Sequence, residues 1–471
     1  MNASSVKKSF SFLLCLIFLL TSGPSFLRAE LATPGADAVL PLADMAVPES
    51  LGKIQERFVG NSSRTILQIQ DVHAHAVAQQ NIASILERLR TVFGVETAAL
   101  EGAWCTTSLP KSHALPTSRE KQLLSMTLLE DDQISGPAYA AIMSPSPITL
   151  VGIEEAALYE QNRSLFLSHL AQTAAIAEKL RLYGASLQTL QSAAWSPELL
   201  SLATGVGAFR ETSDLGKFFP LLLKNAATQA IDLADLAQIV LLRDTLALEK
   251  TLEKERLDQE IKQVIKKYKN TPWTLEELLR GGKIPAEEIG LYPEIKKLAL
   301  LYKMRDGLSI KELSDQIEVL AGRVLEKLFR SPEEKALWEK TSRFYLAEKI
   351  LLLRAAPADL KNYTKEKASL DAELAANGLS EALTLSLDFY ETVKKRDQIF
   401  FDKLMTDPSL AGNIAVVTGG FHTDGLSERF REAGVSYITI APDLGGEAAN
   451  EKLYTERMTA PADQSQAFPS S

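Results

Sequence analysis

Cysteine is almost absent from this chain, which has two in 471 residues. Cys15 lies in an apolar N-terminal run, so Cys105 alone remains for the rest of the protein. One cysteine cannot form an internal disulfide, and a cysteine-based zinc site or redox pair needs at least two thiols. Burial of apolar side chains must therefore supply the stability of the fold.

An excess of positive charge is also lacking. The chain has 51 Lys and Arg against 60 Asp and Glu, with a formal net charge of −9. Nucleic-acid binding depends on basic side chains that neutralise phosphates, so this composition argues against a nucleic-acid partner. Hydrophobic residues make up 46% of the chain and charged residues 24%, which are the proportions of an ordinary globular protein.

Long apolar runs are missing beyond the N-terminus. Lys7 and Lys8 precede an apolar stretch at 10–20, which is followed by helix-breaking residues and by the small residue Ala29. These are the three parts of a secretory signal peptide. We expect residues 1–29 to be removed and the mature protein to be exported, to the periplasm or outside the cell, without a membrane span.

The rest of the chain divides into segments of different composition. We expect an extended linker at 30–63, a first α/β segment at 64–155, a helical insertion at 156–404, a second α/β segment at 405–444 and a disordered tail at 445–471. The insertion has apolar stripes at helical spacing with charged residues between them, which is typical of amphipathic helices. We expect these helices to cover one side of a crevice, as a lid or a substrate-selecting wall.

Strand patterns occur in the two α/β segments. Alternating or β-branched runs predict strands at 65–70, 97–100, 148–153, 414–418 and 435–440. Helical spacing predicts helices at 76–89 and 425–433. The short crossover between the last two strands predicts that they pair in parallel through a right-handed connection. The fold class is therefore α/β, with a parallel or mixed sheet built from the two chain ends and a large all-helical insertion.

Histidine is scarce, with five in the chain, and His73 and His422 each follow a predicted strand. In open α/β sheets, ligands bind at the carboxyl ends of the strands, so we expect these two side chains to meet at one crevice. Glu101 ends the strand at 97–100, and Glu154 and Glu155 end the next one. Imidazole and carboxylate groups at such an edge suit a divalent metal, or acid–base chemistry on a bound water.

The candidate site residues divide into primary and secondary candidates. The candidate catalytic residues are His73, His422, Glu101 and Asp71, and the candidate metal ligands are His73, His422 and Glu101. Secondary candidates are His75, Glu154 and Glu155. His113 lies in a loop rich in Pro and Ser and His169 lies on a predicted helix, so we assign both to structural roles.

These motifs resemble those of the EreA/ChaN/TraB–Tiki superfamily. The similarity rests on Asp-Val-His at 71–73, Leu-Glu-Gly at 100–102 and Gly-Gly-Phe-His-Thr-Asp-Gly-Leu at 419–426. A helix that carries Arg396 before the last strands is similar too, and the resemblance adds Arg396 and Asp424 to the secondary candidates. It covers residues 64–155 and 385–442. The first motif of the family usually reads Gly-Glu-x-His, whereas here residues 70–73 read Gln-Asp-Val-His.

The resemblance implies a site more firmly than a reaction, because fold and function are only loosely coupled. Tiki-like members resemble metal-dependent proteases, EreA-like members are esterases with a histidine base, and ChaN-like members bind haem iron. The resemblance therefore implies an exported hydrolase-like protein that acts on an ester or a peptide, with or without a divalent metal. The alternative is a non-catalytic exported protein that binds haem, a metal or a peptide.

A rival resemblance starts from the His-x-His pair formed by His73 and His75. Such a pair after a first strand also opens the metal site of amidohydrolase-type enzymes, which are TIM barrels. Those sites need further histidines on later strands, and an eightfold strand–helix repeat cannot be laid out across the helical middle of this chain. We therefore rank this alternative below the other two.

Overall fold

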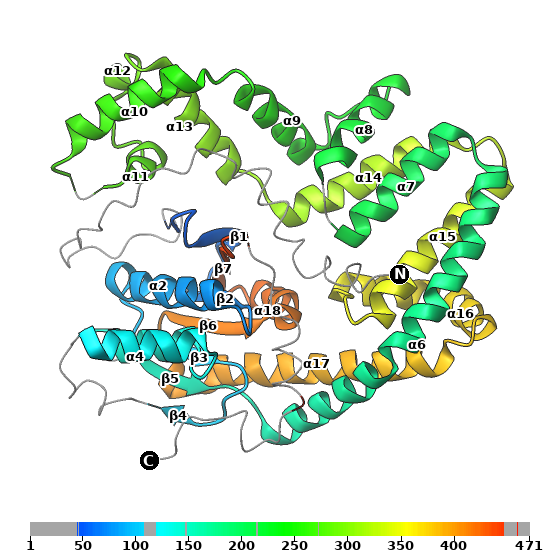
Figure 1. The fold of residues 1–471 in the computed structure, drawn as a ribbon, viewed down its shortest axis with the longest axis horizontal. Helices are drawn as coiled ribbons and strands as arrows, with labels where there is room; N and C mark the ends of the chain where they lie inside the picture. Colours follow the sequence, from blue (N-terminus) through cyan, green and yellow to red (C-terminus); the bar gives the residue numbers. More distant parts are fainter. Residues whose placement is uncertain are drawn as a thin grey trace.

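The computed structural model describes Met45, residues 47–107, 119–146, 148–212, 215–271 and 273–446, and Thr459. The described chain forms an α/β core and a long helical arch that leaves the core and returns to it (Figure 1). The predicted signal peptide, His113 and the tail from 447 to 471, apart from Thr459, lie outside the described residues.

A seven-stranded mixed sheet forms the core, in the order β1–β7–β2–β6–β3–β5–β4. The strands are β1 (Gly52–Phe58), β2 (Thr65–Asp71), β3 (Thr97–Leu100), β4 (Thr106–Thr107), β5 (Thr149–Gly152), β6 (Ile414–Gly419) and β7 (Ser436–Pro442). The inner strands run parallel, and β1 and β4 pair antiparallel at the two edges. The predicted fold class, with both chain ends in one sheet, is confirmed.

The order of the C-terminal strands differs from the prediction. β6 and β7 are connected through helix α18 (Gly420–Glu432) and point the same way, but β2 lies between them, so they do not pair with each other. All three strands are buried over most of their length. A strand that is apolar on both faces can occupy any inner place in a parallel sheet, so the local sequence does not reveal its neighbours.

Strand β1 lies within the segment predicted to be a linker. Its sequence, GKIQERF, has Ile54 and Phe58 as its large apolar residues. Apolar and polar residues do not alternate clearly along it, so the sequence does not predict a strand here. β1 pairs with β7 at the edge of the sheet, and Glu56 pairs there with Arg431 of α18. Charged side chains are common on edge strands because one side of such a strand is open to water.

Helices cover both faces of the sheet. Helices α2 (Ala76–Phe93) and α5 (Gly136–Met143) share one apolar cluster with the strands. Helices α17 (Ser380–Thr406) and α18 share another cluster with the opposite face. Val416 and Val417 are neighbours on β6 but belong to different clusters, so the sheet is the middle layer of three.

The arch is helical throughout its length. Its helices are α6 (Ala156–Ala194), α7 (Pro197–Thr212), α8 (Leu215–Thr228), α9 (Ala237–Glu249), α10 (Lys254–Tyr268), α11 (Leu275–Arg280), α12 (Ala286–Ile289), α13 (Pro293–Asp306), α14 (Ile310–Leu328), α15 (Pro332–Leu351) and α16 (Pro357–Ala376). The described chain also contains α4 (Arg119–Glu130) and a short turn of helix at Pro408–Leu410. α6 and α17 run side by side away from the sheet and form the root of the arch (Figure 1).

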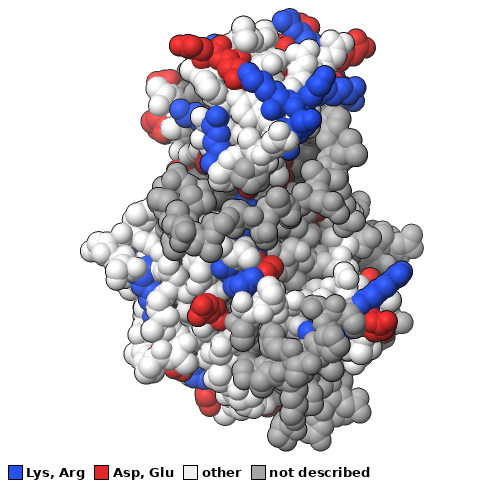
Figure 2. All heavy atoms as spheres, turned by 90° about the vertical axis from the view of Figure 1, so that its left-hand side faces the viewer, with Lys and Arg blue, Asp and Glu red and all other residues white. Residues whose placement is uncertain are grey.

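The far end of the arch contacts the core again. Arg88 of α2 pairs with Glu277 of α11 at 2.7 Å, and Arg280 pairs with Glu49, before β1, at 2.9 Å. Charged side chains of both signs gather over the upper part of the molecule in Figure 2. Within the arch, Lys267 of α10 pairs with Glu288 of α12 at 2.7 Å. No helix in the described ranges combines the length and apolarity needed to cross a membrane.

Candidate functional site

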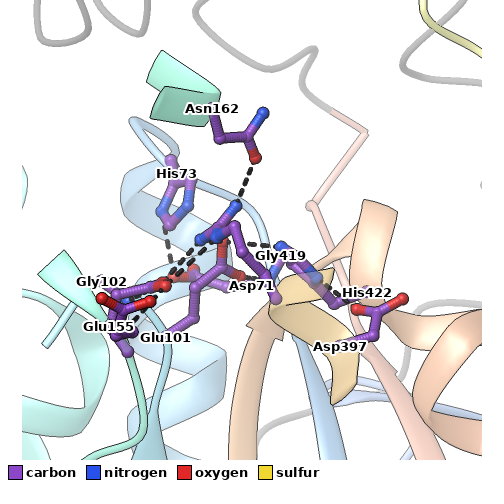
Figure 3. Close-up of polar contacts among 11 residues, drawn as sticks. Asp71, His73, Glu101, Gly102, Glu155, Asn162, Asp397, Gly419 and His422 are labelled. Atoms are coloured by element: carbon purple, nitrogen blue, oxygen red, sulfur yellow. Dashed lines mark hydrogen bonds and ion pairs between the residues drawn. The ribbon is translucent and has the colours of Figure 1, made fainter. Parts of the chain in front are cut away.

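The carboxyl edge of the sheet brings together residues from both chain ends (Figure 3). Asp71 ends β2, Glu101 follows β3, Glu154 follows β5, and Gly419 ends β6. Because β2, β6, β3 and β5 are consecutive in the sheet, their ends converge. The Gly419 N–H donates to Glu101 Oε2 at 2.7 Å, although the two residues are 318 positions apart.

Glu101 is the centre of a buried charge network. Its Oε1 accepts a hydrogen bond from Arg396 at 2.9 Å and lies 3.1 Å from His422 Nε2, while Oε2 accepts the Gly419 N–H. Burial opposes ionisation, but His422, Arg396 and His73 hold the pKa of Glu101 well below its usual range. An ionised carboxylate has about four acceptor positions, so these three contacts with described residues leave one, on Oε2.

His422 is enclosed between two carboxylates. Its Nδ1 lies 2.5 Å from Asp397 Oδ1, and its Nε2 faces Glu101. Burial of the ring opposes protonation, but Glu101 and Asp397 outweigh this effect and raise the pKa of His422 to about 9. At neutral pH the ring is therefore an imidazolium that donates to both acids.

A glycine makes room for Asp397, which follows Arg396 on α17 and was not among the predicted site residues. A Cβ at Gly425 would lie 2.1 Å from Asp397 Oδ2, so α17 and α18 can approach this closely because position 425 has no side chain. The sequence signal for this contact is Gly425, three residues after His422.

Arg396 ties the sheet edge to the root of the arch. Its guanidinium donates to Glu101, to Glu154 at 2.6 and 3.2 Å, and to Asn162 Oδ1 at 2.7 Å. The side chain is 7% exposed, and its Cζ lies 5.6 Å from the centre of the Tyr159 ring. Asn162 and Tyr159 belong to α6 and Arg396 to α17, so the helices at the root of the insertion form one wall of the site. Sequence patterns gave no sign of Asn162 or Tyr159.

His73 is more open than His422. Its Nδ1 lies 2.9 Å from Asp71 Oδ2, and 49% of its side chain is exposed. Asp71 raises the pKa of His73 to about 9, against the effect of burial. Gln79 of α2 donates to Asp71 Oδ1 at 2.6 Å and accepts the Gly136 N–H at 2.6 Å, so it fixes the acid that orients His73. The predicted site did not include Gln79.

Gly419 leaves a space between Glu101 and His73. A Cβ at this position would lie 3.4 Å from Glu101 Oε2 and 4.0 Å from His73 Nε2. The backbone there has φ −61°, which any residue adopts, so the chain conformation does not require glycine. The absent side chain instead leaves a position that both functional groups border.

The other candidates have different surroundings. His75 is 4% exposed and caps α2, with Nδ1 accepting the Ala78 N–H at 3.2 Å. Glu155 is partly buried at the start of α6, and Asp424 is exposed on α18. His169 is buried in the arch, 2.7 Å from a backbone carbonyl oxygen, which fits the structural role expected for it.

The predicted metal ligands suit proton chemistry better than metal binding in this arrangement. Within the described residues, no group of three or more His, Cys, Asp and Glu side chains is placed to hold a metal ion. Both ring nitrogens of His422 face carboxylates, and Glu101 Oε1 already accepts from Arg396. A metal bound by His422 and Glu101 would have to replace a proton directly beside a guanidinium.

The charge network predicts that stability falls at high pH. A histidine whose pKa is raised by folding stabilises the protein fully below its unfolded pKa of about 6.5. This contribution is lost as the pH rises through the folded value of about 9. We expect the urea midpoint of the wild-type protein to fall between about pH 7 and 10, and to change less in a His422→Gln variant. Equal pH dependence in both proteins would show that His422 is not protonated in the folded state.

Comparison with known proteins does not extend the resemblance. No protein-family model, curated protein or solved structure matches this chain. The similarity to the EreA/ChaN/TraB–Tiki superfamily therefore rests on the motifs, and the function has to be inferred from the geometry of the site.

Proposed function

We propose that this chain is an exported hydrolase that cleaves an ester or peptide bond at the carboxyl edge of its sheet. The observation that carries the proposal is the space beside Gly419, which Glu101 Oε2 and His73 Nε2 border from two sides. Hydrolysis needs one group that orients a water and another that protonates the leaving atom. An ionised carboxylate and an imidazolium provide these two functions.

The residues can share the reaction as follows. A water in the space donates to the remaining acceptor position of Glu101 and attacks the carbonyl carbon of the substrate. The new C–O bond forms as the carbonyl double bond opens to a tetrahedral oxyanion. When the carbonyl re-forms, the bond to the leaving oxygen or nitrogen breaks, and His73 gives its proton to that leaving atom. The attacking water loses a proton, which restores His73 through solvent. Because the pKa of Glu101 is low, its main role is to orient the water.

A non-catalytic binding protein is the second candidate. The observation in its favour is that the charged side chains of the network form ion pairs with one another. These are Glu101, Arg396, Glu154, His422 and Asp397. Groups paired in this way can also serve as a rigid scaffold without taking part in a reaction. Such a protein would bind haem, a metal or a peptide. The amidohydrolase alternative fits the fold less well, because among the described strands β1 and β4 do not pair with each other, whereas a TIM barrel is closed.

A screen of the purified protein separates these candidates. Its metal content is measured first, and hydrolysis of methyl esters and of a peptide library is then followed before and after treatment with a chelator. Turnover that survives the chelator supports the acid–base hydrolase. Turnover that needs added metal supports a metal-dependent enzyme, and ligand binding without turnover supports the second candidate.

Filling the space beside Gly419 should stop the reaction. In a Gly419→Ala variant the new methyl group lies between Glu101 and His73, at ordinary contact distances, so we expect a loss of activity of about 100-fold or more with little change in stability. Gly420→Ala is the matched control, because a Cβ there meets no atom of the described residues within 4 Å. Equal activity in the two variants would place the reaction elsewhere.

A further inference from the structure

We propose that Trp104 and Tyr159 form a subsite for an aromatic group of the substrate, beside the bond that is cleaved. This inference rests on the proposed function for the position of that bond. The ligand class is a molecule with a planar aromatic ring attached near an ester or amide group.

The backbone of Trp104 is anchored at the rim of the site. The Glu154 N–H donates to the Ala103 carbonyl oxygen at 2.9 Å, which ties the segment after β3 to the end of β5. A Cβ at Gly152 would lie 2.3 Å from that oxygen and 2.5 Å from the Trp104 nitrogen, so this close approach depends on a glycine. Trp104 therefore has a fixed backbone next to Glu154, one of the partners of Arg396.

The Tyr159 ring connects Trp104 to the buried cation. The rings of Trp104 and Tyr159 meet edge to face, with centroids 6.4 Å apart. The Tyr159 ring also lies near Arg396, whose Cζ is 5.6 Å from the ring centre. Burial and the nearby charge of Glu101 raise the pKa of Tyr159, which agrees with a position close to the site. An aromatic surface thus leads from the charge network outward to Trp104.

Trp104 is unusually open for a side chain of its type. It is 46% exposed, whereas Trp195 is 7% exposed and both Trp273 and Trp338 are partly buried. An indole on a fixed backbone offers a large apolar area and loses little conformational freedom when a ligand covers it. The neighbouring charges of Glu154 and Arg396 neutralise each other, so the surface beside the indole favours an uncharged ring over a charged group.

A binding experiment tests the subsite without turnover. Saturation-transfer NMR compares phenylacetamide with acetamide, which lacks the ring. We expect wild-type protein to bind phenylacetamide in preference to acetamide, Trp104→Ala to bind it about tenfold more weakly, and Trp104→Phe to retain most of the affinity. Leu291→Ala is the control, because Leu291 is also a large apolar side chain and is 73% exposed in the arch. Equal binding by wild type and Trp104→Ala, or no preference for the ring, would overturn the proposal.

A kinetic experiment places the subsite beside the reaction. With methyl phenylacetate, Trp104→Ala should raise KM about tenfold and leave kcat nearly unchanged, and with methyl acetate it should change neither constant. If neither ester is cleaved but Trp104 still determines phenylacetamide binding, the subsite stands and the proposed hydrolysis fails. If both esters are cleaved and Trp104→Ala treats them as the wild type does, the hydrolase stands and the subsite is wrong.

Discussion

A His73→Gln variant should hydrolyse its substrate about 10²–10⁴-fold more slowly than the wild type, because glutamine cannot give a proton to the leaving atom. The fold should be unaffected, since 49% of the His73 side chain is exposed and its hydrogen-bond partner Asp71 is also held by Gln79. The measurement is the initial rate on the best ester or peptide from the screen, with circular dichroism to check folding. His113→Gln is the control, because His113 has no assigned part in the site.

The pH profile identifies the role of His73. Asp71 raises the pKa of His73 to about 9, so an acid in this position works below that pH and fails above it. Wild-type activity should therefore decline as the pH rises through about 9. Activity that instead increases up to this pH would mean that His73 acts as a base, and full activity in His73→Gln would reject the site altogether.

An Arg396→Met variant should lose about 3–5 kcal/mol of unfolding free energy, the usual cost of removing one partner from a buried ion pair. Methionine matches the length of the arginine stem, but it leaves the 1% exposed Glu154 without its cation and Glu101 with His422 as its remaining cationic partner. Urea denaturation at neutral pH, followed by circular dichroism, measures the change.

Two comparison variants make this result interpretable. Arg181→Met removes an arginine that pairs with Glu178 on the surface of α6, and it should leave the urea midpoint nearly unchanged. Adding Glu154→Gln to Arg396→Met removes the carboxylate that the first change leaves without a cation, and it should recover part of the loss. If Arg396→Met is as stable as the wild type, the network does not stabilise the fold.

The inner strands of the sheet could be predicted because their sequences are strongly apolar. β2, β3, β5, β6 and β7 all lie within two residues of the predicted ranges. The edge strands were missed for a physical reason: β1 is mostly polar, and β4 has only two residues. The position of β2 between β6 and β7 could not be predicted from local sequence patterns either, because it depends on contacts between distant segments.

The site was predictable where chemistry and strand ends coincide. Asp71, His73 and Glu101 lie at the ends of β2 and β3. Ligands bind at the carboxyl ends of strands in open α/β sheets, so the predicted strands were enough to identify these residues as candidates. Asn162 and Gln79 lie on helices, where polar residues are common and a buried one has no distinctive pattern. Only the folded chain shows that both are buried and hydrogen-bonded to charged partners.

The place of β6 between β2 and β3 sets the order in which the core can form during synthesis. β2 and β3 are made early but have no ladder with each other, and each gains its shared neighbour only after the whole helical insertion has been translated. Pairing over such a distance along the chain is slow, because a long loop must close first. The N-terminal strands therefore lack their full set of native partners until β6 and then β7, which ends at Pro442, have been made. Passage through a secretion channel requires an unfolded chain. Late formation of the core keeps the chain unfolded for longer, which agrees with the export that we propose.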